Sequence, residues 1–83
     1  MLKFKRSKTH TAEGVAALLA ARKYLTNTII SLREVACAYA ELGIGLNEIL
    51  QIECKLRDMR EKCRNAMPTE HIEGVEEAKK RWS

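Results

Sequence analysis

Hydrophobic side chains recur along residues 12–42 at the spacing of one helix face. The repeat places an apolar residue at every seventh position, with further apolar residues at the companion spacing and Thr28 as the polar exception. The repeating residues are Leu18, Leu25, Leu32 and Tyr39, and the companions are Ala21, Val35 and Leu42. This spacing is typical of a coiled-coil seam. The pattern therefore predicts one long helix over about 12–42, which starts beside the capping residues Thr9 and Thr11.

The uncharged part of this predicted helix is much wider than one seam. At about 100° per residue, its uncharged arc also takes in small and aromatic residues. These residues are Ala17, Ala20, Tyr24, Ile29, Ser31, Ala36 and Ala38. One neighbouring helix cannot cover so wide an arc, so the pattern predicts more than one packing partner for residues 12–42.

A second helix is predicted over residues 46–67, after the break at Gly43 and Gly45. Its apolar positions follow a 3-4 spacing and are Ile49, Ile52, Leu56, Met59, Cys63 and Ala66. The short connection predicts an antiparallel hairpin in which paired positions have numbers that sum to about 88. Pro68 then ends the second helix.

A third, shorter helix is predicted over about 70–82, with an apolar stripe of Ile72, Val75, Ala78 and Trp82. The fold class is therefore all-α, a long antiparallel helical hairpin plus a shorter third helix, in one domain over residues 11–83. A chain of this size has a marginal core, so we expect assembly into a helical-bundle oligomer. The residues expected to mediate self-association are Leu18, Tyr24, Ile29, Ile30 and Tyr39.

Charge separates the first ten residues from the helical domain. Residues 1–10 hold four basic and no acidic residues, while the other 73 hold eleven of each sign, so the net charge of +4 resides in this basic arm. The candidate binding residues of the arm are Lys3, Phe4, Lys5, Arg6 and Lys8. Such an arm favours phosphate groups, as in a nucleic acid, a lipid surface or an acidic partner, with strong salt dependence.

The residues that carry chemistry do not form a catalytic or metal-binding pattern. Cys54 and Cys63 lie about 180° apart on a helix, so they cannot share a metal ion, and the glycines form no phosphate-binding loop. We expect no enzyme activity, no metal and no cofactor. The odd number of cysteines and the lack of a secretory signal or membrane span indicate free thiols and a cytoplasmic protein.

Three function classes fit these observations. The first is a non-catalytic helical interaction protein that binds itself and an unidentified protein partner, as small accessory proteins of viruses and mobile elements often do. The second is a nucleic-acid-binding regulator that uses the arm and the corner at residues 38–49, which locally resembles a helix-turn-helix. That resemblance is weak, because Glu48 and bulky aliphatic residues occupy the positions that would read bases. The third is a small-ligand binder whose pocket forms between subunits.

Overall fold

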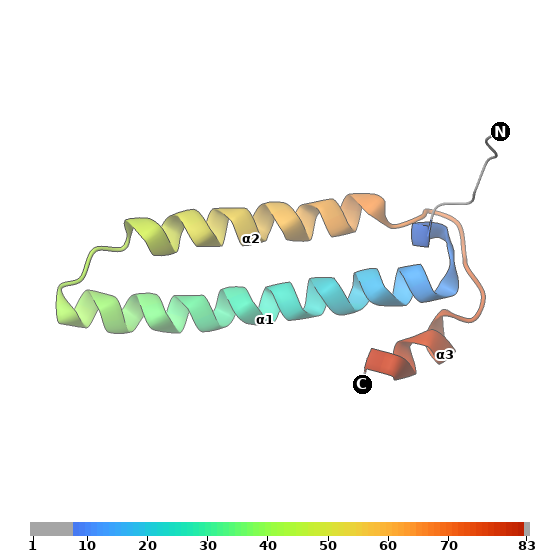
Figure 1. The fold of residues 1–83 in the computed structure, drawn as a ribbon, viewed down its shortest axis with the longest axis horizontal. Helices are drawn as coiled ribbons and strands as arrows, with labels where there is room; N and C mark the ends of the chain where they lie inside the picture. Colours follow the sequence, from blue (N-terminus) through green and yellow to red (C-terminus); the bar gives the residue numbers. More distant parts are fainter. Residues whose placement is uncertain (1–7, 83) are drawn as a thin grey trace.

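A computed structural model describes residues 8–82 of the chain. The elements are the 3₁₀ turn η1 (Lys8–His10), the helices α1 (Ala12–Leu42), α2 (Asn47–Ala66) and α3 (Val75–Lys79), and the 3₁₀ turn η2 (Lys80–Trp82). Figure 1 shows α1 in the middle, with α2 antiparallel along one side and α3 against the other. The all-helical hairpin with a short third helix is thus confirmed, and no strand occurs among the described residues. Assembly into an oligomer stays a prediction.

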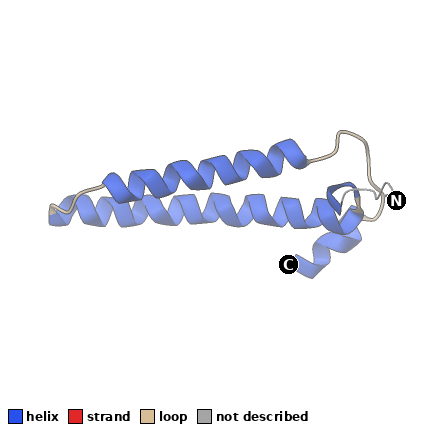
Figure 2. Ribbon diagram, turned by 45° about the horizontal axis from the view of Figure 1, so that its top comes forward, coloured by secondary structure: helices blue, strands red, loops and turns tan. Residues whose placement is uncertain are grey.

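Both ends of α1 are capped by the chemistry that the sequence predicts. At the start, the Thr11 hydroxyl oxygen accepts a hydrogen bond from the Gly14 backbone N–H at 3.0 Å. At the end, Gly43 adopts a left-handed conformation with φ of 72°, and the Ile44 N–H donates to the Tyr39 carbonyl at 2.9 Å. This Schellman arrangement satisfies the last carbonyls of α1 and turns the chain back. α2 then runs beside α1, which is longer and extends beyond α2 at both ends (Figure 2).

The hairpin keeps the predicted register but uses a different set of companion positions. The contacts Arg33–Glu53 and Thr26–Arg60 join residues whose numbers sum to 86, close to the predicted 88. On α1, the companions Val15 and Ile29 are buried and Arg22 and Ala36 are half-buried, whereas the predicted companions Val35 and Leu42 and the polar Thr28 are exposed. On α2, Ile52 and Met59 are 47% and 50% exposed, while the side chains next to them on the seam side are half-buried. Each helix is therefore rotated so that one predicted apolar set faces away from its neighbour.

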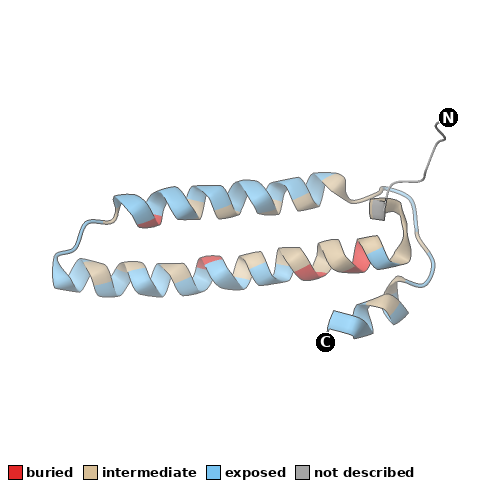
Figure 3. Cartoon of the chain, in the orientation of Figure 1, coloured by how far each residue is buried: buried red, intermediate tan, exposed pale blue. Residues whose placement is uncertain are grey.

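The core that results is small. Among the described residues, the buried hydrophobic side chains are Val15, Ala16, Ala20, Ile29 and Ile49, and none of them is a large side chain buried completely. Figure 3 shows these residues as isolated bands on otherwise exposed or half-buried helices. Within residues 8–82, nine large hydrophobic side chains are more than a third exposed. A single chain thus leaves much of its apolar surface uncovered.

The third helix begins at Val75, five residues later than the sequence predicts. Gly74 has φ of 86°, a conformation that ends regular helix and favours glycine. Its backbone also approaches α1 closely, because an added Cβ would lie 3.5 Å from the Ala12 Cβ. Ile72, predicted on the helix stripe, instead belongs to the connecting segment and lines a hollow with Val15. The connecting segment covers the start of α1 in place of an extra helical turn.

α3 packs against the first half of α1, on the face opposite α2 (Figure 1). The small groove between them is lined by Ala16, Leu19, Ala20, Lys23, Tyr24, Lys79 and Trp82. The Tyr24 hydroxyl donates to the Trp82 backbone carbonyl at 3.2 Å. This contact fixes the end of η2 on α1, about three helical turns beyond Ala12, the residue that Gly74 approaches.

Candidate interaction surface

One long edge of the hairpin is uncharged on α1 from end to end. Its α1 residues follow a regular 3-4 spacing and are Ala21, Tyr24, Thr28, Ser31, Val35, Ala38 and Leu42. All but Ala21 are exposed, and Leu42 reaches 71%. α2 contributes Ile52 and Met59, which are seven residues apart and therefore share a face. We call these nine residues the apolar edge.

An open groove of about 480 Å³ shows that the two helices contribute to the same edge. Its α1 residues are Ala21, Tyr24, Leu25 and Thr28, and its α2 residues are Met59, Lys62 and Cys63. Lys62 is the one charged residue that lines it. The same face extends by one heptad to Val35 and Ile52, so the groove is one part of a longer apolar strip.

The hydroxyl group of Thr28, a polar group on the apolar edge, already has a hydrogen-bond partner within α1. The Thr28 hydroxyl donates to the Tyr24 carbonyl one turn earlier at 2.7 Å. This bond leaves the Thr28 methyl group free to face a partner without an unpaired donor. Covering the edge would therefore bury apolar atoms without stranding this hydroxyl.

The opposite edge of the hairpin is polar. The Glu53 carboxylate lies 2.7 Å from one Arg57 guanidinium nitrogen and 3.5 Å from Arg33 on α1. Farther along, Arg60 donates to the Thr26 hydroxyl at 3.1 Å. These contacts link α1 and α2 and fix which edge of the hairpin is polar. The hydrogen bond from Arg57 is the largest cause that lowers the pKa of Glu53 below its ordinary value, and the charge of Arg33 also lowers this pKa.

This ion pair predicts a measurable titration at the polar edge. Because the pKa of Glu53 is lower in the folded chain, its ionised form stabilises the fold fully above the pKa of the unfolded chain. That contribution is lost as the pH falls through the folded pKa. We expect NMR titration of the Glu53 carboxyl carbon to show a midpoint below the ordinary pKa of a glutamate side chain. Arg57→Gln should raise the midpoint toward the ordinary value, and an unchanged midpoint would contradict the assigned cause.

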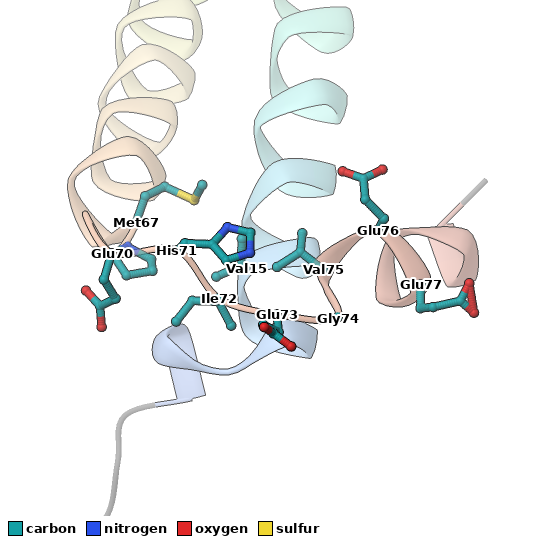
Figure 4. Close-up of a pocket in the computed structure, with 11 residues that line it drawn as sticks. Val15, Met67, Glu70, His71, Ile72, Glu73, Gly74, Val75, Glu76 and Glu77 are labelled. Carbon is teal, nitrogen blue, oxygen red and sulfur yellow. The ribbon is translucent and has the colours of Figure 1, made fainter.

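A hollow of about 520 Å³ at the end of the hairpin gathers several acidic residues without forming a site. It lies between Val15 on α1 and the segment that runs from Met67 into α3. In Figure 4 the carboxylates of Glu70, Glu76 and Glu77 lie apart around the rim, while His71 lies beside the valines. Nowhere in residues 8–82 do three or more His, Cys, Asp or Glu side chains gather as metal ligands.

None of the described helices is both long and apolar enough to cross a membrane.

The structure separates the five residues predicted to mediate self-association. Ile29 is 3% exposed and lies inside the hairpin, whereas Tyr24 and Ile30 are 48% and 54% exposed. Leu18 and Tyr39 are half-buried. Ile29 therefore has no surface to offer a second chain, and Tyr24 is the member of this set that belongs to the apolar edge.

The basic arm lies mostly outside the described residues. Lys3, Phe4, Lys5 and Arg6 precede residue 8, and the backbone of Lys8 begins η1. The helix-turn-helix-like corner has a clear geometry, since α1 and α2 lie side by side after the Gly43 turn (Figures 1 and 2). A helix-turn-helix crosses its helices at about 90–120°. The local resemblance at residues 38–49 therefore does not extend to the arrangement of the helices.

The sequence predicts that the uncharged arc with Tyr24, Ser31 and Ala38 needs a second packing partner, but it does not identify the whole apolar edge. It assigned Val35, Ile52 and Met59 to the seam within the chain. The signal that marks the edge is the second charge-free heptad on α1, from Ala21 to Leu42, which one neighbouring helix cannot bury together with the first.

Comparison with known proteins finds no family model, no curated protein and no solved structure that matches the chain.

Proposed function

We propose that this chain is a non-catalytic helical interaction protein that self-associates and, as an assembly, binds a macromolecular partner. The observation that carries this proposal is the apolar edge. Val35, Leu42 and Met59 are 42%, 71% and 50% exposed, along a strip whose α1 side has no charge. Contiguous exposed apolar patches of this kind mark interaction sites.

The apolar edge has the dimensions of a stable interface. At about 1.5 Å per residue, Ala21 to Leu42 spans about 32 Å, and two helices packed about 10 Å apart present a width of about 20 Å. The flat projection is then on the order of 600 Å² per copy, and accessible area exceeds projected area. Standard protein interfaces bury about 800 Å² per partner. Apolar burial on this scale also supplements the small core of the described residues, which has five buried side chains of small or medium size.

The direct test is the mass of the native protein at micromolar concentration. Size-exclusion chromatography with light scattering should give at least twice the chain mass of 9.4 kDa. Circular dichroism on the same sample should show a helical protein that unfolds cooperatively. A folded, cooperative monomer would overturn the proposal.

A surface for a different partner remains on the other side of the hairpin. Ile30 and Leu50 are 54% and 55% exposed. Each lies one helical turn from the polar edge, at Arg33 and Glu53 respectively. Apolar side chains among charged ones are typical of the mixed surfaces that transient partners use.

Nucleic acid is the second candidate partner, and the charge distribution is the observation that favours it. All of the excess positive charge belongs to the arm, since residues 11–83 hold eleven basic and eleven acidic residues. We expect deletion of residues 2–8 to abolish binding to a labelled duplex. The full chain should show a salt slope of roughly −3 to −4, as four phosphate contacts give. Undiminished binding by the truncated chain would place the contacts on the helices instead.

A further inference from the structure

The α1 residues of the apolar edge are complementary in size to the same residues of a second α1 that runs in the opposite direction. Counted outward from Ser31, the two largest side chains, Tyr24 and Leu42, each match an alanine on the other side, and Val35 matches Thr28, which has nearly the same size. Tyr24 stands seven residues before Ser31 and Ala38 seven after it. Leu42 lies eleven residues after Ser31, and Ala21 lies ten residues before it. Val35 lies four residues after Ser31, and Thr28 lies three residues before it. A stripe with this property packs well against a second copy that runs the opposite way.

We propose that a second copy of this chain covers the apolar edge, with the α1 helices antiparallel and a two-fold axis at Ser31. The inference rests on the self-association proposed above and specifies its geometry. Tyr24 then faces Ala38 of the partner subunit, and Leu42 faces Ala21 of the partner subunit. At the axis, Ser31 meets Ser31 of the partner subunit, and two small residues there let the backbones approach closely. α3 does not obstruct this pairing, because it lies on the other side of α1 and reaches the stripe only at Tyr24.

The same two-fold axis also pairs the exposed residues of α2. The hairpin register places Lys55 beside Ser31 or Leu32, so positions on α2 pair when their numbers sum to about 110. Ile52 then packs on Met59 of the partner subunit. Glu48 lies opposite Lys62 of the partner subunit, and the symmetry forms this pair twice.

Charge favours this arrangement over the other two-fold packing of the edge. With the axis parallel to the helices, α1 would lie on α2 of the second copy, and Glu48 and Lys62 would both face uncharged α1. The antiparallel arrangement pairs these two charges. Two like charges approach each other in this arrangement at Lys55 and Lys55 of the partner subunit, near the axis. The long apolar stem of each lysine lets its ammonium group reach water.

A cysteine at the axis tests the geometry directly. The native thiols are first removed by Cys37→Ser, Cys54→Ser and Cys63→Ala. Ser31→Cys in this background should form a covalent dimer rapidly under mild oxidation, because the two thiols meet across the axis. Glu34→Cys is the matched control, since residue 34 lies on the back of α1, and it should cross-link at least tenfold more slowly. Equal rates, or no dimer from Ser31→Cys in a protein that still associates, would overturn the arrangement.

A charge exchange on α2 gives an independent test. Glu48→Lys and Lys62→Glu should each weaken dimerisation roughly fivefold to thirtyfold, and the double variant should recover most of the loss. The two positions are about 21 Å apart along one helix, so recovery requires contact between copies. Dimerisation is measured by sedimentation equilibrium at low salt. Dimers without recovery would overturn this inference and leave self-association standing, whereas a monomeric native chain would overturn both.

Discussion

Ile29→Ala is expected to lower the free energy of unfolding by about 2–5 kcal/mol, the cost of removing a buried branched side chain. Ile29 is 3% exposed and lies between α1 and α2. A domain of 83 residues has a total stability of roughly 4–12 kcal/mol, so the change removes a large share of it. Urea denaturation followed by circular dichroism at fixed protein concentration measures the effect.

Ile30→Ala is the matched control for this prediction, because it makes the same chemical change one residue away. Ile30 is 54% exposed, and its replacement should change the unfolding free energy by less than about 0.5 kcal/mol. Equal losses for the two variants would mean that Ile30 is covered by another copy of the chain. That result would move the interface from the apolar edge to the opposite side of the hairpin.

Val35→Lys is expected to dissociate the assembly while leaving each hairpin folded. Val35 is 42% exposed in the single chain, so a lysine there is tolerated by the monomer. In the assembly, symmetry places this charge twice in an apolar interface, where desolvation opposes binding. We expect the dissociation constant to rise by at least about 100-fold, equivalent to about 2.7 kcal/mol.

Light scattering and circular dichroism on one sample separate the two effects of this substitution. The expected variant has the mass of one chain and retains its helical signal. Glu34→Lys, on the back of α1, serves as the control and should keep the native mass. A Val35→Lys variant with unchanged mass would show that the apolar edge does not hold the copies together.

The helix ranges of the hairpin followed from periodicity, but the choice between two apolar faces did not. Leu18, Leu25 and Leu32 have companions on both sides, and each set has one polar exception, Arg22 in one and Thr28 in the other, so the spacing alone fits either set. The structure buries the set with Ile29 and exposes the set with Val35. One partner helix fills only one side of a heptad repeat, so periodicity shows that a second face exists without showing which face packs within the chain.

The third helix shows a different limit. Its predicted start followed from Pro68 and the acidic residues after it, whereas the structure begins α3 after Gly74. That glycine was visible in the sequence, and its tendency to adopt positive φ outweighed the favourable acidic start. The sequence of α1 contains no glycine or proline between Val15 and Leu42, so α1 was easier to predict.

The start of α1, the end of α2 and α3 all gather at one end of the hairpin, and this arrangement sets a spacing (Figure 1). In the proposed antiparallel pair, Ala12 lies nineteen residues from the axis at Ser31, so the two α1 starts would stand about 57 Å apart. A ligand shorter than this distance can engage only one end of a dimer, and a ligand with two binding sites would link separate dimers into chains. Only an elongated ligand could contact both ends at once and gain the affinity of two-point attachment.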